Sequence, residues 1–184
     1  MSLIFSIIFI LSAILTIFGN IYSNINNDIK YRIIILISYI LWCITFLYNL
    51  ANNLCKNSCG PVHLRLSSVF MLLCFFIINL ILKLFENKLQ KETYDKLIKS
   101  TYSIPLTASI LFCLAAFYTQ FNLTTFNVNN IYGMSGSLLL LISSLLSITN
   151  NYNSSIGVSS GMLMLIIQTF IIMYLKYNIP KRIV

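Results

Sequence analysis

Charge is what this sequence lacks. Only 9% of its 184 residues are Asp, Glu, Lys or Arg, and the long stretch between Lys99 and Lys176 contains none of them. About a quarter of the residues in ordinary globular domains are charged, so this composition excludes a water-soluble fold. The hydrophobic fraction of 58% and the mean hydropathy of +0.86 are typical of a multi-pass integral membrane protein.

Residue patterns that carry catalysis are also lacking. The chain has a single histidine, His63, and its four acidic residues lie outside the long apolar runs. No acid–base pair or metal-ligand cluster can be assembled from these residues, so we expect no enzyme activity, no cofactor and no metal. The apolar runs carry no ionisable residue in their interiors, which disfavours proton- or ion-coupled transport.

What the sequence does contain is a series of long apolar runs. A membrane-spanning helix needs about 20 mostly apolar residues, and backbone groups in lipid must pair within their own segment. We therefore predict an all-α fold, a polytopic transmembrane helix bundle that forms one membrane domain over residues 1–184. The predicted spans are residues 2–22, 33–53, 66–85, 102–121, 131–149 and 156–177. The fifth run is rich in Ser and Gly, so a bundle of five spans is the alternative.

Basic residues at the ends of these runs indicate an orientation. The loops after the first and third runs carry seven Lys and Arg residues. The opposite side, formed by the second loop and the C-terminal end, carries five, and Arg65 is assigned to the second loop. The positive-inside rule then favours odd-numbered loops in the cytoplasm and both termini outside. Which membrane holds the protein does not follow from the residues.

One polar segment, residues 86–100, interrupts the apolar runs. Its pairs Glu92–Lys96 and Asp95–Lys99 have the spacing and order that support a helix. We predict a short amphipathic stalk between spans three and four, either the third helix continuing into water or a basic helix on an anionic leaflet. A plain solvated connector and a docking site for a partner are both compatible with this composition.

The net charge of +8 also concerns possible partners. Because the basic residues flank apolar runs, they indicate anionic lipid, especially near the segment from Lys83 to Lys99, and not nucleic acid.

The sequence also contains a weak internal repeat. Ser67-Ser68 precede an apolar run that ends at Lys83, and Ser159-Ser160 precede a similar run that ends at Lys176. Two three-helix units joined directly would be inverted relative to each other, as in several transporters.

Small residues mark where helices approach closely. Gly157 and Gly161 form a GxxxG motif at the start of the last run, and Ser137 and Ser144 lie on a Ser-rich face of the fifth. Such residues let two helix backbones pack together, within this chain or against a partner protein.

Neutral polar residues lie inside other runs. Trp42, Asn79 and Gln168 are able to hydrogen-bond to neighbouring helices, or to line a site for a neutral solute.

Two cysteines, Cys55 and Cys59, fall in a polar loop. They form a disulfide if that loop faces an oxidising compartment, and otherwise remain free thiols. With His63 they give a Cys-x3-Cys-x3-His spacing, but a zinc site usually has a tighter cysteine pair and three or four ligands. Gly60 and Pro61 break a helix that would align all three, so we favour the thiol interpretation.

These features leave two functional hypotheses open. The first is a non-enzymatic accessory subunit that packs against a larger membrane transporter, pump or complex through its small-residue helix faces. The alternative is a small facilitator for a neutral solute, built from two three-helix units. Neither rests on a sequence motif with known chemistry, so the distinction depends on how the polar residues are arranged in space.

Overall fold

The chain folds almost entirely into helices. The computed structural model describes residues 3–26, 28–51, 60–121, 128–148 and 153–178, and no strand occurs within these ranges. The helices are α1 (Leu3–Asn26), α2 (Ile29–Ala51), α3 (Gly60–Leu84), the short 3-10 helix η1 (Glu86–Lys88), α4 (Lys91–Thr101), α5 (Ser103–Phe121), α6 (Val128–Ile148) and α7 (Asn153–Asn178).

Six of these helices are long and apolar enough to cross a membrane, which confirms the predicted all-α polytopic bundle and favours six spans over five. Four of them, α2, α3, α6 and α7, begin before the predicted spans. α3 begins at Gly60, six residues before the predicted span, and α2 begins at Ile29. Hydropathy detects only the apolar middle of a helix, whereas polar residues such as His63 and Arg65 lie in the first two turns of the same helix.

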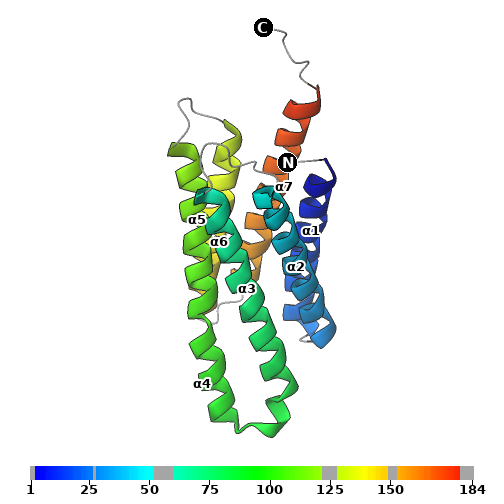
Figure 1. The fold of residues 1–184 in the computed structure, drawn as a ribbon. Coiled ribbons are helices and arrows are strands. Elements are labelled where there is room, and N and C mark those ends of the chain that lie inside the picture. Colours follow the sequence, from blue (N-terminus) through cyan, green and yellow to red (C-terminus); the bar gives the residue numbers. More distant parts are fainter. Residues whose placement is uncertain (1–2, 27, 52–59, 122–127, 149–152, 179–184) are drawn as a thin grey trace.

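The six spans form a closed ring. α1 contacts α2, α2 contacts α3, α3 contacts α5, α5 contacts α6, α6 contacts α7, and α7 returns to α1. Figure 1 shows these helices running roughly parallel to one another, with neighbours in opposite directions. Two inverted units, α1–α3 and α5–α7, would give this order of contacts, so the arrangement is compatible with the weak repeat in the sequence.

The two ends of the bundle differ. At one end, called the terminal end below, α1 begins and α7 ends; at the other, the α4 end, α4 lies beyond the rest of the bundle (Figure 1). The turn between α1 and α2 belongs to the α4 end. There the backbone N–H of Lys30 donates to Asp28 Oδ1 at 3.2 Å, which caps α2. The hydrogen bond from the Lys30 ammonium also lowers the pKa of the Asp28 carboxyl, which therefore stays ionised at neutral pH.

The polar stalk does not continue α3. α3 stops at Leu84, η1 turns the chain, and α4 runs back toward the bundle, where only Tyr102 separates it from α5 (Figure 1). Of the two alternatives for the stalk, the third helix continuing into water is therefore wrong, because the stalk extends the fourth span. The other alternative, a basic helix on an anionic leaflet, stays a prediction. The 25 residues of α3 rise about 37 Å, so α3 exceeds the roughly 30 Å of hydrocarbon and leaves room for this hairpin.

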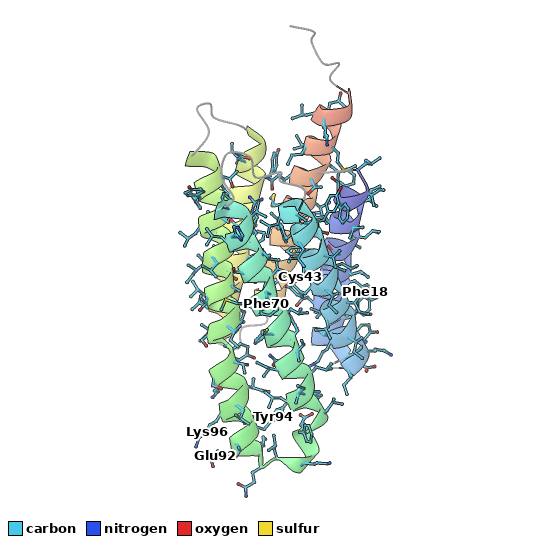
Figure 2. All side chains as sticks on the ribbon, viewed as in Figure 1. Phe18, Cys43, Phe70, Glu92, Tyr94 and Lys96 are labelled. Carbon is cyan, nitrogen blue, oxygen red and sulfur yellow. The ribbon has the colours of Figure 1, made fainter. Side chains whose placement is uncertain are left out.

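Charged side chains stabilise the hairpin locally. Lys83 Nζ lies 2.5 Å from Glu86 Oε2, and Lys96 Nζ lies 2.8 Å from Glu92 Oε1. Figure 2 shows Glu92 and Lys96 on the outer side of α4. The second predicted pair, Asp95 with Lys99, makes no ion pair in the described segment. An exposed helix pair such as Glu92–Lys96 contributes only about 0.3–0.5 kcal/mol, so it supports α4 without anchoring it to the bundle.

The outer surface of the ring is apolar. Phe18 on α1 and Phe70 on α3 are 41% and 59% exposed and point away from the bundle (Figure 2). Large exposed hydrophobic side chains occur on all six spans. A surface of this kind is stable only against hydrocarbon, so the chain is an integral membrane protein whose environment is a lipid bilayer.

Glycines bring α6 and α7 into close contact. A Cβ at Gly136 would lie 2.9 Å from the Gly161 carbonyl oxygen, and a Cβ at Gly161 would lie 2.9 Å from that of Gly136. A Cβ at Gly157 would lie 3.0 Å from Ser143 Cβ. The helix that meets the GxxxG motif is therefore α6 of the same chain.

We predict that Gly136→Ala and Gly161→Ala each destabilise the protein. The new methyl group meets a backbone oxygen that has no free space to move into, and overpacking of this type costs about 1–3 kcal/mol. Thermal unfolding in mild detergent measures the effect. Gly60→Ala is the matched control, because its Cβ would meet only a Tyr118 ring carbon at 3.6 Å. Equal unfolding temperatures for all three variants would show that the contact is not tight.

Candidate functional site

The ring encloses a cavity of about 440 Å³, called the central cavity below. All six spans contribute to its lining, and the volume falls within the usual range for small-molecule sites. It extends from Trp42 and Met162, near the middle of the bundle, to Ser23 and Arg32 near the α4 end. The remaining polar or aromatic lining residues are Asn20, Tyr39, Ser68, Phe75, Phe76, Asn79, Tyr102, Ser109, Phe112, Ser143, Ser144 and Ser147.

Hydroxyl groups that line the central cavity also join the helices around it. Ser68 Oγ donates to the Ala108 carbonyl oxygen at 2.6 Å, linking α3 to α5. The hydroxyls of Ser109 and Ser144 lie 2.6 Å apart and link α5 to α6. These groups give the cavity a wall that is partly polar, although much of their hydrogen-bonding capacity is used between helices.

One donor in this wall has no partner. Trp42 is 1% exposed, and its Nε1 makes no hydrogen bond among the described residues. A buried N–H without an acceptor costs about 1–3 kcal/mol. Since Trp42 lines the central cavity, a ligand oxygen or a water in the cavity is able to accept that hydrogen bond.

A second, smaller cavity of about 120 Å³ lies toward the terminal end and is called the terminal cavity. Its polar lining residues are Arg65 on α3, with Gln168 and Thr169 on α7. Its other lining residues are Phe9, Phe46, Phe112, Ala116, Gly133, Leu165 and Ile172. The polar groups are therefore few and converge in an otherwise apolar space.

Four buried aromatic side chains, the aromatic cluster, separate the two cavities. Trp42 stacks on Phe9 and Phe112, with ring centroids 5.0 and 6.2 Å apart, and meets Phe46 edge-on at 6.4 Å. Phe112 lines both cavities, Trp42 lines only the central one, and Phe9 and Phe46 line only the terminal one. The two spaces thus follow one another along the bundle, with the aromatic cluster between them.

The position of Arg65 differs from the one expected from the sequence. It was placed in a loop, and the interior of the bundle was expected to lack basic residues, but it lies in the second turn of α3 and faces inward. Its Nη2 donates to Thr119 Oγ1 on α5 at 3.4 Å, a long hydrogen bond, and its Nε is shielded without a partner among the described residues. Hydropathy failed here because a polar run at residues 55–63 precedes Arg65 and makes it resemble loop sequence.

The residues singled out as neutral polar positions fall into two groups. Trp42 and Asn79 line the central cavity, where Asn79 Nδ2 donates to the Phe75 carbonyl oxygen of its own helix at 2.9 Å. Gln168 lines the terminal cavity instead, with its amide against Gly133, where a Cβ would lie 2.6 Å from Gln168 Nε2. The single site expected for these three residues is therefore divided by the aromatic cluster.

The other expected site residues lie as follows. Ser144 reaches Ser109 across the α5–α6 contact, and Ser137 is fully buried, with its hydroxyl donating to Met134 O of its own helix at 2.8 Å. Cys55 and Cys59 lie outside the described residues. No group of three His, Cys, Asp or Glu residues that could hold a metal ion occurs in the described part of the chain.

Lining residues that the sequence did not reveal include Phe112, Arg32 and Ser143. Ser137, Ser144 and Ser147, spaced seven and three residues apart, were visible as a helix face. The sequence did not show which helices this face contacts, because the order of helices around the ring is set by contacts between distant parts of the chain.

We predict that Phe112→Ala joins the two cavities. Removing the ring deletes the side chain that borders both, and quenching of the only tryptophan, Trp42, by acrylamide should become markedly stronger. Phe70→Ala removes the same ring from the lipid-facing surface and should leave quenching unchanged. An equal increase in both variants would indicate general loosening of the bundle and contradict the predicted role of Phe112.

Comparison with known proteins gives no relative: no family model, curated protein or solved structure matches this chain. The two cavities and the residues that line them are therefore the basis for a functional assignment.

Proposed function

We propose that this protein is a facilitator for a small polar solute. The sequence left open, as the second of two functions, a facilitator for a neutral solute, and this proposal widens the class of solute to include small anions. The observation that carries the proposal is the succession of two internal cavities along the axis of a closed helix ring. A solute would enter the central cavity from the α4 end, pass the aromatic cluster and reach the terminal cavity. Rotation of the ring of Phe112, which borders both spaces, would open the passage.

The composition of the cavities supports passive movement of the solute. Their described lining residues include no Asp or Glu, so neither cavity offers a carboxylate to exchange a proton or hold a cation. Coupled carriers usually place such a group within the membrane. The solute would therefore move down its own gradient.

The inverted arrangement of the helices also supports a transport role. In many transporters the solute site lies near the middle of the membrane, between two inverted units. Here Trp42 and Phe112, from opposite halves of the chain, meet with ring centroids 6.2 Å apart near the middle of the bundle. A solute in the central cavity would thus contact both halves.

The accessory-subunit hypothesis has less structural support. Its expected interface was the small-residue face of the last two runs, but Gly136 and Gly161 are already packed against each other within the chain. The feature that still favours a partner is the α3–α4 hairpin, whose charged outer side projects beyond the spans.

We predict solute flux through vesicles that contain the purified protein. Swelling rates measured by stopped-flow light scattering, with urea, glycerol, formate and nitrate as probes, should exceed those of protein-free vesicles for at least one probe. Asn79→Leu should reduce that flux several-fold by removing a polar group from the central cavity. Thr107→Leu, which removes a polar group from an exposed position on α5, should not reduce it. Rates equal to those of empty vesicles for all four probes would refute the proposal.

We also predict that the protein is stable without a larger companion. Purified through a tag in mild detergent from its native membrane, it should migrate as a lone monomer or dimer on a native gel. Recovery of a stoichiometric larger membrane protein, released by Gly157→Leu or Gly161→Leu, would instead support the accessory-subunit hypothesis.

A further inference from the structure

We infer that the terminal cavity is a binding site for a small monovalent anion, held by the guanidinium of Arg65. The inference rests on the proposed function in so far as it names the class of solute that passes through the bundle. The site itself is defined by the residues around Arg65, and its occupancy is measurable without transport.

The first argument is that no acidic side chain is available to neutralise Arg65. The whole chain contains four acidic residues, and all belong to the α4 end or the hairpin beyond it. They are Asp28 just before α2, and Glu86, Glu92 and Asp95 between α3 and α5. Arg65 Nε is shielded without a partner among the described residues, and no carboxylate side chain of the chain lies at this end of the bundle. This arrangement is costly, so a counter-ion in the adjacent cavity stabilises it.

The second argument is the direction of the side chain. Arginines near helix ends commonly reach back to the lipid headgroups. Arg65 instead points into the ring, since it lines a cavity together with residues of α1 and α7 and contacts Thr119 of α5. The guanidinium carries five N–H donors, and the described residues provide one acceptor at 3.4 Å, so most of these donors remain for a ligand.

The third argument is that the neighbouring groups suit an anion. The Gln168 side chain lines the same cavity and carries an amide with two N–H donors. Farther along the bundle, Trp42 Nε1 is another donor without a partner. A solute that moves between the two cavities therefore meets unpaired donors at both levels, which favours an acceptor-rich solute over a cation.

The size of the terminal cavity and the composition of its wall limit which anions fit. A volume of about 120 Å³ lies below the roughly 300–1,000 Å³ of sites for drug-sized ligands, so the cavity suits a small ion or a few waters. The apolar wall, which includes Phe9, Phe46 and Leu165, disfavours a strongly hydrated multivalent anion. A halide, nitrate or formate fits these limits, and a large organic anion such as gluconate does not.

Binding is tested on the purified full-length protein in detergent. Line broadening of chloride in ³⁵Cl NMR should be saturable and should be competed away by nitrate or formate but not by gluconate, at constant ionic strength. Arg65→Gln should weaken the apparent affinity at least ten-fold. Lys176→Gln removes one positive charge from an exposed position at the same end of the bundle and should leave the affinity unchanged.

A second variant distinguishes loss of the anion site from misfolding of the Arg65→Gln variant. Gln168→Leu removes the amide while retaining Arg65, and should weaken binding by a smaller factor than Arg65→Gln. Absence of saturable broadening in the wild-type protein would overturn the inference and leave water as the occupant of the cavity. Equal affinity in the wild type and a folded Arg65→Gln variant would overturn it as well.

The two proposals fail separately. Saturable anion binding that depends on Arg65, with no flux of any probe in vesicles, would refute the facilitator while leaving the anion site in place. Flux of urea or glycerol without anion binding would refute the anion site while leaving the facilitator in place.

Discussion

Close packing of small residues around the ring is the constraint on which the rest of the structure depends. In lipid, apolar side chains gain little by leaving hydrocarbon for one another, so helices associate through short contacts and hydrogen bonds. Thr16 and Ser38 join α1 to α2 at 2.9 Å, Ser109 and Ser144 join α5 to α6, and glycines bring α6 against α7. These contacts lie at three of the six junctions of the ring, whereas at the junction of α2 and α3 the rings of Tyr39 and Phe76 stack.

A ring closed in this way has space along its axis. Small side chains occupy much of the inner surface at the α4 end, where Ser68, Ser109 and Ser143 border the central cavity. Large aromatic side chains also border this cavity, among them the stacked pair Tyr39 and Phe76, and the aromatic cluster lies between it and the terminal cavity. Toward the terminal end the space opens again beside Arg65. The distribution of small and large residues thus produces two cavities with a barrier between them.

The fold could be predicted from the sequence much further than the site. Long apolar runs gave the number and type of the spans, because a helix in lipid must be apolar over about 20 residues. The same reasoning misplaced Arg65, since hydropathy does not distinguish a polar residue in a loop from one in the first turns of a span. It also could not show that Gly161 meets Gly136, or that Gln168 and Asn79 lie in different cavities. These facts depend on the order of helices around the ring, which nothing local in the chain specifies.

The position of Arg65 has an electrical consequence. Five residues separate it from the start of α3, a rise of about 7.5 Å, or roughly a quarter of the hydrocarbon thickness if α3 starts at its edge. A full elementary charge that crosses 100 mV changes in energy by about 2.3 kcal/mol. An ion that reaches Arg65 from the terminal side would traverse about a quarter of that drop, close to the thermal energy. Its residence beside the guanidinium would therefore vary with the membrane voltage, and a protein without a voltage sensor would still respond to polarisation of the bilayer.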